Sequence, residues 1–210
     1  MLGLLMDGGW MMVPLLACSI FGLAVIIDRL RAFRAAGNDF EVLRKNVRGK
    51  LDQGDVAGAM ELASNAKGPV AATLLTGLNR FVKLAGRGRA NEEAAASAIK
   101  SMEEYAPKAM RPLENRLNLL VLVAAIAPLL GMTGTVTGMI TSFDVMASSA
   151  GLDPGAVAGG IGEALITTAA GLLIAMPCSV FYNIFTRKVD DMTASIDTGL
   201  TDMMETVGEA

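Results

Sequence analysis

The 210-residue chain contains no histidine and only two cysteines. Without histidine it lacks the usual general base of enzymes, the side chain that titrates near physiological pH and the commonest metal ligand. Cys18 and Cys178 each lie inside an apolar run, so they supply neither a disulfide framework nor the paired spacing of a zinc site. We therefore expect no metal, no cofactor and no enzymatic activity.

Charged residues are also scarce. Only 19% of the residues are charged, against about 25% in an average soluble domain, and no basic tract interleaved with aromatic residues indicates nucleic-acid binding. Three windows contain no charged residue at all, namely 8–27, 117–143 and 164–186. Each reaches the roughly 20 apolar residues that a helix needs to cross a bilayer, so they predict three transmembrane helices. The second is longer than a bilayer requires and should tilt, kink or project beyond the lipid.

Basic residues are confined to two regions. Sixteen of the 18 Lys and Arg residues lie within 29–116, and the other two are Arg187 and Lys188. Because short loops rich in Lys and Arg stay in the cytoplasm, the N-terminus and first span (1–28) should begin outside and lead to a cytoplasmic helical domain (29–116). The second and third spans with a short outer loop (117–186) and a cytoplasmic C-terminal helix (187–210) should follow. Trp10 would anchor the first span at one membrane interface.

The cytoplasmic region is predicted to be helical. Glycine-containing breaks at 53–55, 67–69 and 86–88 divide it into successive helices. The last helix, from about residue 91, shows no clear stop before the second span, so we expect it to run continuously into the membrane, with Pro107 and Pro112 as bends.

An apolar stripe continues from the third span into the C-terminal tail. Its members fall at steps of three and four residues, as on one face of a helix. The stripe could pack on the chain's own helices or on neighbouring subunits, and both interpretations stay open here. The residues are Phe185, Val189, Met192, Ile196, Leu200, Met203 and Val207.

Small residues recur at helical spacing in the second and third spans. Such stripes let helix backbones approach closely in lipid, where no hydrophobic drive brings helices together. They predict tight packing of these two helices with each other or with a neighbour. The small residues are Gly131, Gly134 and Gly138 in the second span and Ala164, Gly171 and Ala175 in the third.

Hydroxyl side chains gather in the same two spans. A single intramembrane threonine usually donates to a carbonyl of its own preceding turn. Six across two helices favour a wetted or ion-contacting surface as well. They are Thr133, Thr135, Thr137, Thr141, Thr167 and Thr168.

Glu163 is the one ionisable residue expected within a span. It either caps the third helix at the outer interface, where the helix dipole favours negative charge, or faces a partner or a water-filled cavity at depth. Burial would favour the neutral acid and so create a proton-exchange site. Because a proton relay needs further titratable groups, a conducting assembly would require a second polypeptide that brings another acid.

At these two spans the sequence resembles the MotA/TolQ/ExbB family of proton-channel subunits. The matching stretches are APLLGMTGTVTGMITSF (127–143) and GGIGEALITTAAGLLIAMPCSVFYN (159–183). The three-span layout is similar to the ExbB and TolQ branch, whereas flagellar MotA-type subunits have four spans.

The resemblance implies an all-α protein of the bacterial inner membrane with a periplasmic N-terminus. Its subunits would form a ring, expected as a homopentamer, with the second and third spans lining a pore. A single-span ExbD- or TolR-like subunit, as a dimer in the pore, would supply an aspartate. Proton flow would energise outer-membrane transport or envelope maintenance through a TonB- or TolA-like partner. By motif, Glu163 would be the exchangeable acid or polar gate, and Thr135 and Thr168 would face that aspartate. Further candidate pore hydroxyls are Thr133, Thr137 and Thr167.

Two features depart from the family pattern. Met132 and Thr133 stand where many members have two apolar residues, and Thr137 stands where well-known members have tryptophan. They leave the coupling ion, proton or sodium, open. The alternatives are a MotA-like or gliding-type stator subunit, and a non-conducting membrane scaffold in which Glu163 is only a cap.

Overall fold

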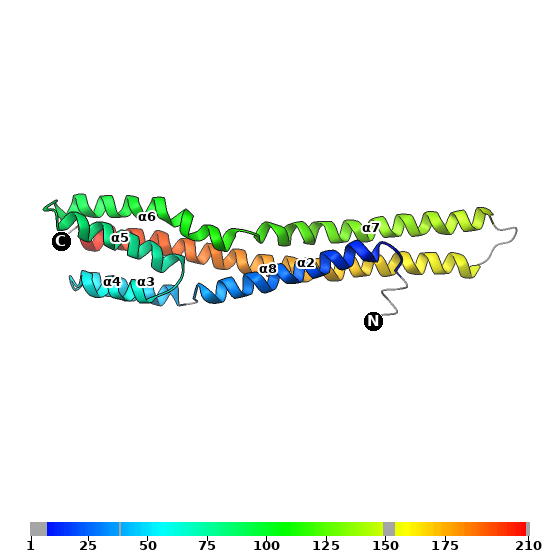
Figure 1. Cartoon of the computed structure of the whole chain (residues 1–210), viewed down its shortest axis with the longest axis horizontal. Coiled ribbons are helices and arrows are strands. Elements are labelled where there is room, and N and C mark those ends of the chain that lie inside the picture. The colour runs from blue at the N-terminus through cyan, green and yellow to red at the C-terminus, as the bar shows by residue number, and fades with distance from the viewer. Residues whose placement is uncertain (1–7, 38, 149–153, 209–210) are drawn as a thin grey trace. The chain divides into compact units, whose positions relative to one another are not determined.

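The computed structural model describes residues 8–37, 39–148 and 154–208, and every regular element in these ranges is an α-helix (Figure 1). The chain divides into two compact units, which are described separately. The three-helix unit comprises 1–28 and 116–184, and the polar unit comprises 29–115 and 185–210. The helices are α2 (Met12–Ala35), α3 (Phe40–Leu51), α4 (Val56–Asn65), α5 (Pro69–Ala85), α6 (Asn91–Glu114), α7 (Leu117–Ser148) and α8 (Pro154–Gly208).

Three helices in the described residues are long and apolar enough to cross a membrane, as predicted. They are built on α2, α7 and α8, and α2 and α8 each contribute residues to both units. Helix α7 has 32 residues and keeps Pro128 inside it. At 1.5 Å per residue it is about 48 Å long, against a hydrocarbon core of about 30 Å. It therefore exceeds what a perpendicular span requires.

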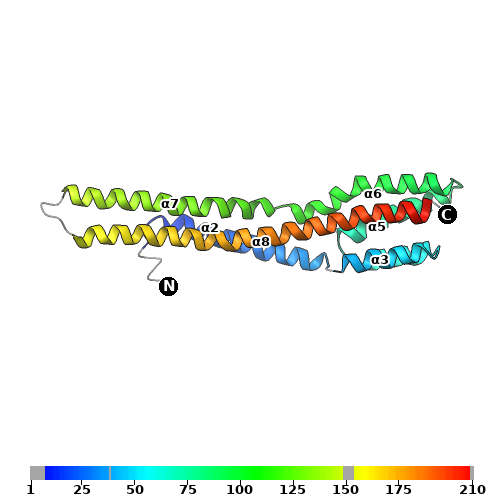
Figure 2. The same ribbon diagram turned by 180° about the vertical axis from the view of Figure 1, so that it is seen from behind.

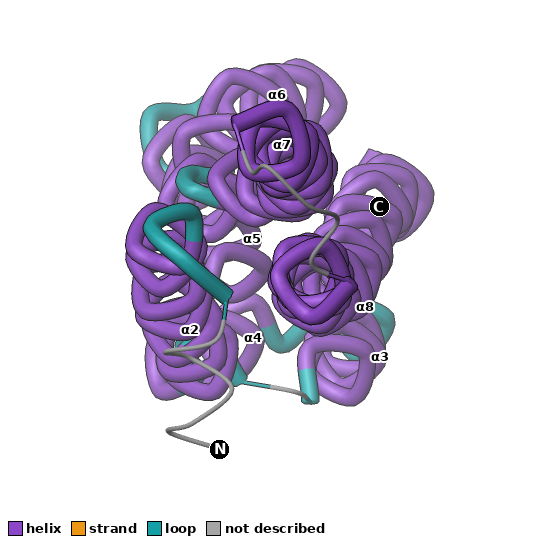
Figure 3. The backbone as a smooth tube through the Cα atoms, turned by 90° about the vertical axis from the view of Figure 1, so that its right-hand side faces the viewer, coloured by secondary structure: helices purple, strands orange, loops and turns teal. Residues whose placement is uncertain are grey.

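In the three-helix unit, α7 and α8 run side by side (Figure 2), and α2 forms the third corner of the bundle when viewed along the helices (Figure 3). The first turns of α2 pack on both other helices, because Met12 and Leu15 form one buried cluster with Ala127 and Ala175. At Asp28, the last residue of α2 in this unit, a salt bridge of 3.1 Å joins the helix to Arg116. The part of α2 in this unit thus contacts the other helices through a buried apolar cluster at its start and an exposed ion pair at Asp28.

The prediction of one continuous helix from residue 91 into the second span is wrong. Helix α6 ends at Glu114, Asn115 is extended (φ −54°, ψ 137°) and Arg116 has a φ of 72° before α7 begins. Within the polar unit the buried Arg29 guanidinium donates 2.8 Å hydrogen bonds to the carbonyl oxygens of Pro112 and Asn115. These carbonyls can lie at a helix end because a distant guanidinium satisfies them, which no local pattern in the sequence reveals.

The predicted breaks in the polar unit are confirmed. Asp55 is the N-cap of α4 and accepts a 2.8 Å hydrogen bond from the amide of Gly58. Pro69 begins α5, where its missing N–H is harmless. Helices α5 and α6 pack on each other, and α3 and α4 pack beside them.

The apolar stripe of the α8 tail packs on the chain's own helices. Phe185 stacks on Phe33 with ring centroids 5.0 Å apart and the rings nearly parallel. Gly77 lies close to the sulfur atoms of Met102 and Met203, so α5 contacts both α6 and the tail there. The side chain of Val207 lies outside the described part of the chain. The buried members of the stripe are Phe185, Val189, Met192, Ile196 and Met203, and Leu200 is half-buried.

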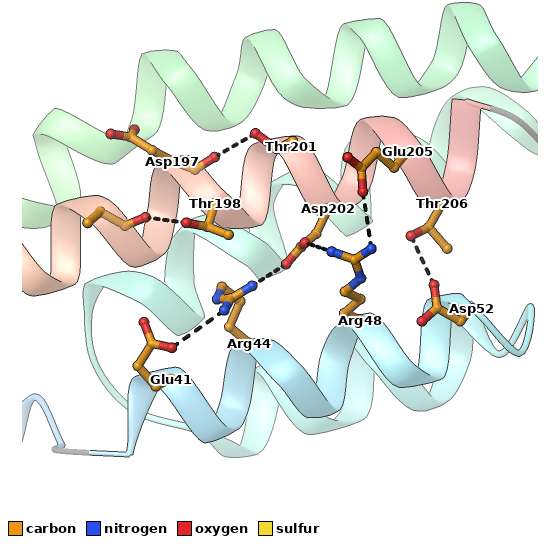
Figure 4. Close-up of polar contacts among 11 residues, drawn as sticks. Glu41, Arg44, Arg48, Asp52, Asp197, Thr198, Thr201, Asp202, Glu205 and Thr206 are labelled. Carbon is orange, nitrogen blue, oxygen red and sulfur yellow. Dashed lines mark hydrogen bonds and ion pairs between the residues drawn. The ribbon is translucent and has the colours of Figure 1, made fainter.

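A charged cluster fixes the tail to α3 (Figure 4). Asp202 is only 4% exposed and accepts from Arg44 at 2.5 Å and from Arg48. Arg48 also pairs with Glu205 at 3.1 Å. The Asp202 carboxylate beside it raises the pKa of the Arg48 guanidinium above its usual value. The cluster is centred on one buried carboxylate with two arginine partners, and no local pattern in the sequence predicts it.

Candidate ion-conducting site

The backbones of α7 and α8 approach closely at the small residues. A Cβ atom at Gly131 would lie 2.9 Å from the Cα atom of Thr168, and one at Gly171 would lie 2.5 Å from the carbonyl oxygen of Ala127. In real structures a Cβ atom essentially never lies that close to the backbone of a neighbouring helix. These two glycines therefore set the separation of the helices.

The remaining small residues lie in interfaces within the same unit. A Cβ atom at Gly134 would lie 2.5 Å from Cγ2 of Thr167, and one at Gly138 would lie 3.1 Å from the Cβ atom of Ala164. Ala175 belongs to the buried cluster that α2 forms with the other two helices. All six small residues thus lie in helix contacts of a single chain.

The two threonines singled out by the motif resemblance are both half-buried, and both hydroxyls already donate. Thr168 donates across the helix interface to the carbonyl oxygen of Gly131 at 3.0 Å. Thr135 donates within α7 to the carbonyl oxygen of Met132 at 2.6 Å. A hydroxyl that donates keeps its acceptor lone pairs, so each can still accept from water or from a protonated group.

Three further threonines form a row along α7. Thr133 donates to the carbonyl of Leu129 at 2.8 Å, Thr137 to that of Thr133 at 3.1 Å, and Thr141 to that of Thr137 at 3.0 Å. Thr133 and Thr141 are exposed in the single chain, and Thr137 is half-buried. The row presents oxygen atoms at one-turn intervals on one face of the helix.

Glu163 is not a helix cap. Helix α8 begins at Pro154, so Glu163 lies more than two turns inside the helix, where the backbone amides are already bonded. The cap interpretation is therefore wrong. The residue is half-buried and precedes Thr167, which is 1% exposed.

The turn before α2 lies against the same part of α8. The hydroxyl of Thr167 lies 2.7 Å from the carbonyl oxygen of Glu163 and 3.2 Å from that of Gly8. Oε1 of Glu163 lies so close to Gly9 that a Cβ atom there would be 1.6 Å away. This contact was not predicted. The only signal for it is the Gly8-Gly9 pair directly before the first span.

No group of three His, Cys, Asp or Glu side chains within the described ranges could hold a metal ion. What the three-helix unit does offer is the carboxyl group of Glu163 on α8, that of Asp144 near the end of α7, and a set of hydroxyl and carbonyl oxygens along these two apolar helices. Carboxyl and hydroxyl groups can exchange or relay protons, and oxygen atoms can replace part of the hydration shell of a cation.

These features define a three-span helical membrane protein with polar groups set inside its apolar helices. The chain belongs to the MotA/TolQ/ExbB proton channel family, whose family model matches residues 65–198. The match extends from the polar unit through α7 and most of α8. It confirms the resemblance found in the two motifs, and the family is one of channel subunits rather than of enzymes.

Curated relatives place the chain in the ExbB-like branch. It is 31% identical to an ExbB-like protein of Synechocystis sp., over 86% of this chain and 82% of that one. It is 32% identical to the biopolymer transport protein exbB1 of Vibrio cholerae, over 90% and 80% of the two chains. With the biopolymer transport protein ExbB of Pseudomonas putida it shares 28% identity over 77% of this chain, which spans only 50% of that longer protein.

Proposed function

We propose that this chain is the proton-channel subunit of an inner-membrane motor of the ExbB–ExbD or TolQ–TolR kind. The observation that carries the proposal is the position of Glu163, a carboxyl group more than two turns inside an apolar helix and followed by Thr167 and Thr168. A carboxyl group in that setting is costly unless it faces water or a partner. Its role would be to take up and release a proton.

The depth of Glu163 follows from the charged residues at the other end of the spans. Residues 163 and 187 are 24 apart, or about 36 Å along a helix, whereas the hydrocarbon core is about 30 Å thick. With Arg187 at the cytoplasmic boundary, Glu163 would lie about 6 Å beyond the periplasmic edge of the core if the helix is perpendicular to the membrane, and nearer to that edge if the helix tilts. Trp10, which is 69% exposed, lies in the turn that contacts it and suits an interfacial position. Glu163 would then be the acid at the periplasmic mouth, with Thr168 and Thr135 deeper.

Apolar faces of α7 and α8 support an oligomer around a second polypeptide. Both helices carry many exposed large apolar side chains that lipid or neighbouring subunits would cover, including Leu129, Val136, Leu165, Leu173 and Met176. Glu163 would be the acid that this chain brings to the pathway, and a single-span ExbD- or TolR-like subunit, as a dimer inside a pentameric ring, would bring another. The N-terminus would be periplasmic and the polar unit cytoplasmic, where its Lys and Arg residues belong.

Work would be delivered through a TonB- or TolA-like protein to outer-membrane transport or envelope maintenance. The relatives named for biopolymer transport favour this role over a MotA-like or gliding-type stator. In the third possibility, a scaffold without ion flow, the carboxyl group of Glu163 would have no function.

The test uses the complex purified from native membranes by a tag on this chain. A co-purifying single-span protein with a membrane aspartate is expected, and proteoliposomes containing the complex should conduct protons. Glu163→Gln keeps the shape and removes the ionisable group, so it should abolish proton flux and leave the assembly intact. Glu92→Gln, at an exposed position in the polar unit, is the matched control and should conduct normally.

Each outcome has a clear meaning. Unchanged flux in Glu163→Gln would remove the acid from the pathway, and absence of flux in the wild-type complex would favour the scaffold. A partner with a peptidoglycan-binding domain, in place of a TonB- or TolA-like protein, would favour the stator.

A further inference from the structure

We propose that Gly9 is a positioning residue for the Glu163 carboxyl group, and that the turn at residues 8–10 covers that group. The proposal deepens the role given to Glu163 and rests on the proposed function, although the placement of the turn does not. Nothing in the two family motifs includes this segment, which lies more than 100 residues earlier in the chain.

The first argument is steric. Oε1 of Glu163 occupies the space where a side chain at residue 9 would begin, since a Cβ atom there would lie 1.6 Å from Oε1 and 2.7 Å from the carboxyl carbon. Only glycine lets the backbone and the carboxyl group share this space. The φ of Gly9 is +62°, a conformation that also favours glycine.

The second argument is that the turn is held in place on α8. The carbonyl oxygen of Gly8 lies 3.2 Å from the hydroxyl of the buried Thr167, one turn after Glu163. A Cβ atom at Gly8 would lie 3.5 Å from Ile166, so the turn rests on the helix surface. The amide of Met12 donates to the carbonyl of Gly9 at 3.1 Å and ties the turn to the start of α2.

The consequence concerns access to the acid. A carboxyl group at the mouth of a proton pathway must reach its partner and must not exchange freely with every other acceptor. With Gly9 against Oε1, one side of the carboxyl group is closed by backbone, and its orientation is restricted to the other side. A larger residue at position 9 would displace either the carboxyl group or the turn, and both changes would uncover the acid.

The experiment measures access directly, in native membranes with the full chain and its partners. Dicyclohexylcarbodiimide modifies protonated carboxyl groups in apolar surroundings, and mass spectrometry of the peptide reports the extent at Glu163. We expect Gly9→Ala to increase this modification several-fold. Glu163→Gln identifies the modified site by abolishing the signal.

A control variant separates backbone strain from the contact with Glu163. It uses a glycine that also has a positive φ but has free space around it. Gly88 has a φ of +77°, and a Cβ atom there would meet nothing within 4 Å. Gly88→Ala should leave modification at Glu163 and proton flux as in the wild type. An equal extent of modification in Gly9→Ala and wild type, zero included, would overturn the proposal without bearing on whether the complex conducts.

A second variant tests whether the two residues act through each other. Gly9→Ala should reduce proton flux, and adding Glu163→Asp, which withdraws the carboxyl group by one methylene, should restore it relative to Gly9→Ala alone. If strain in the turn were the cause, the shorter acid would give no recovery. Loss of flux in Glu163→Gln together with unchanged flux in Gly9→Ala would leave the proposed function standing and remove the positioning role.

Discussion

The two units of this chain are held together in different ways, although helix α8 runs through both. In the three-helix unit, α8 presents Ala164 and Gly171 and approaches α7 at backbone distance. In the polar unit, the same helix presents Phe185, Met192 and Ile196, which are large and almost fully buried. One helix therefore changes its means of packing along its length.

The surroundings of each unit explain the difference. In lipid, burying a leucine gains little because the tails are as apolar as the protein, so close backbone approach and hydrogen bonds between helices dominate. In water, removing apolar surface is the main driving force. The polar unit also holds a charged cluster, in which the buried carboxylate of Asp202 is paired with Arg44 and Arg48. Variants that break one kind of contact should therefore act in one unit only.

The largest effect is expected from Asp202→Ala in the polar unit. It removes the counter-charge of Arg44, whose side chain is only 13% exposed and keeps only a longer 3.4 Å contact with Glu41. Breaking one partner of a buried pair costs about 3–5 kcal/mol, which should detach the end of α8 from α3. Hydrogen–deuterium exchange of the tail peptides should rise strongly, with little change in the peptides of α7.

The matched control is Glu205→Ala, on the same helix and within the same cluster. Its side chain is 55% exposed, and an exposed pair contributes at most about 1 kcal/mol. The tail should stay protected from exchange. Equal exchange in the two variants would mean that Asp202 is not the buried anchor of the tail.

Gly171→Ala should have the next largest effect, in the three-helix unit. The new methyl group would meet the carbonyl oxygen of Ala127 at 2.5 Å, and backbone atoms cannot rotate away. Overpacking of this kind costs about 1–3 kcal/mol. Thermal unfolding in detergent should begin at a lower temperature. Gly159→Ala, on the same helix with nothing within 4 Å, should unfold like the wild type, and equal melting of both variants would contradict close approach at Gly171.

Thr168→Val separates stability from function. The variant loses the hydrogen bond to Gly131, and such bonds between membrane helices contribute about 0.6 kcal/mol on average. Thermal stability should therefore fall only slightly, while proton flux through the proteoliposomes should be lost if the hydroxyl lies on the ion path. Thr133→Val, which removes a hydroxyl bonded within its own turn, tests whether the exposed row contributes. Normal flux in Thr168→Val would remove that residue from the path.

The smallest effect is expected at the start of α4 and depends on pH. The hydrogen bonds from Lys50 and from the amide of Gly58 lower the pKa of Asp55 below its usual value of 3.8. A lowered pKa in the folded state means that the contribution is present at neutral pH and is lost as the pH falls below 3.8 towards the folded-state value. Hydrogen exchange at the amide of Gly58 should rise in that pH range, and Asp55→Asn should weaken this dependence of exchange on pH. If exchange at Gly58 depended on pH in the same way in Asp55→Asn, a group other than Asp55 would be responsible.

Much of this architecture was predictable because it rests on local patterns. Charge-free windows gave the three spans, and the turn around Gly54 and Asp55 gave the start of α4. The break at 115–116 was not predictable, since it depends on Arg29, more than 80 residues earlier, which satisfies the carbonyls of the helix end. The contact of Gly9 with Glu163 was missed for the same reason, because two glycines before a span do not indicate which helix they will meet.

The same distinction between local patterns and long-range contacts applies to the candidate site. The residue types and their spacing singled out Glu163 and the threonines as candidates, since an acid beside an apolar run and repeated hydroxyls in apolar helices are informative wherever the helices lie. Their hydrogen bonds were not predictable: Thr168 donates across to Gly131, whereas Thr135 donates within its own helix. Both are β-hydroxyl residues in similar surroundings in the sequence, so only the neighbouring helix distinguishes them.

The sequence by itself determined that this chain has three apolar helices and a polar helical region, because hydrophobicity and charge act residue by residue against lipid and water. The tertiary structure alone decided that the tail packs on α3 through Asp202, that α6 stops at Glu114, and that Glu163 lies against a glycine. Each of these depends on pairs of groups far apart in the chain, whose meeting is set by how the helices pack and not by the residues that flank them.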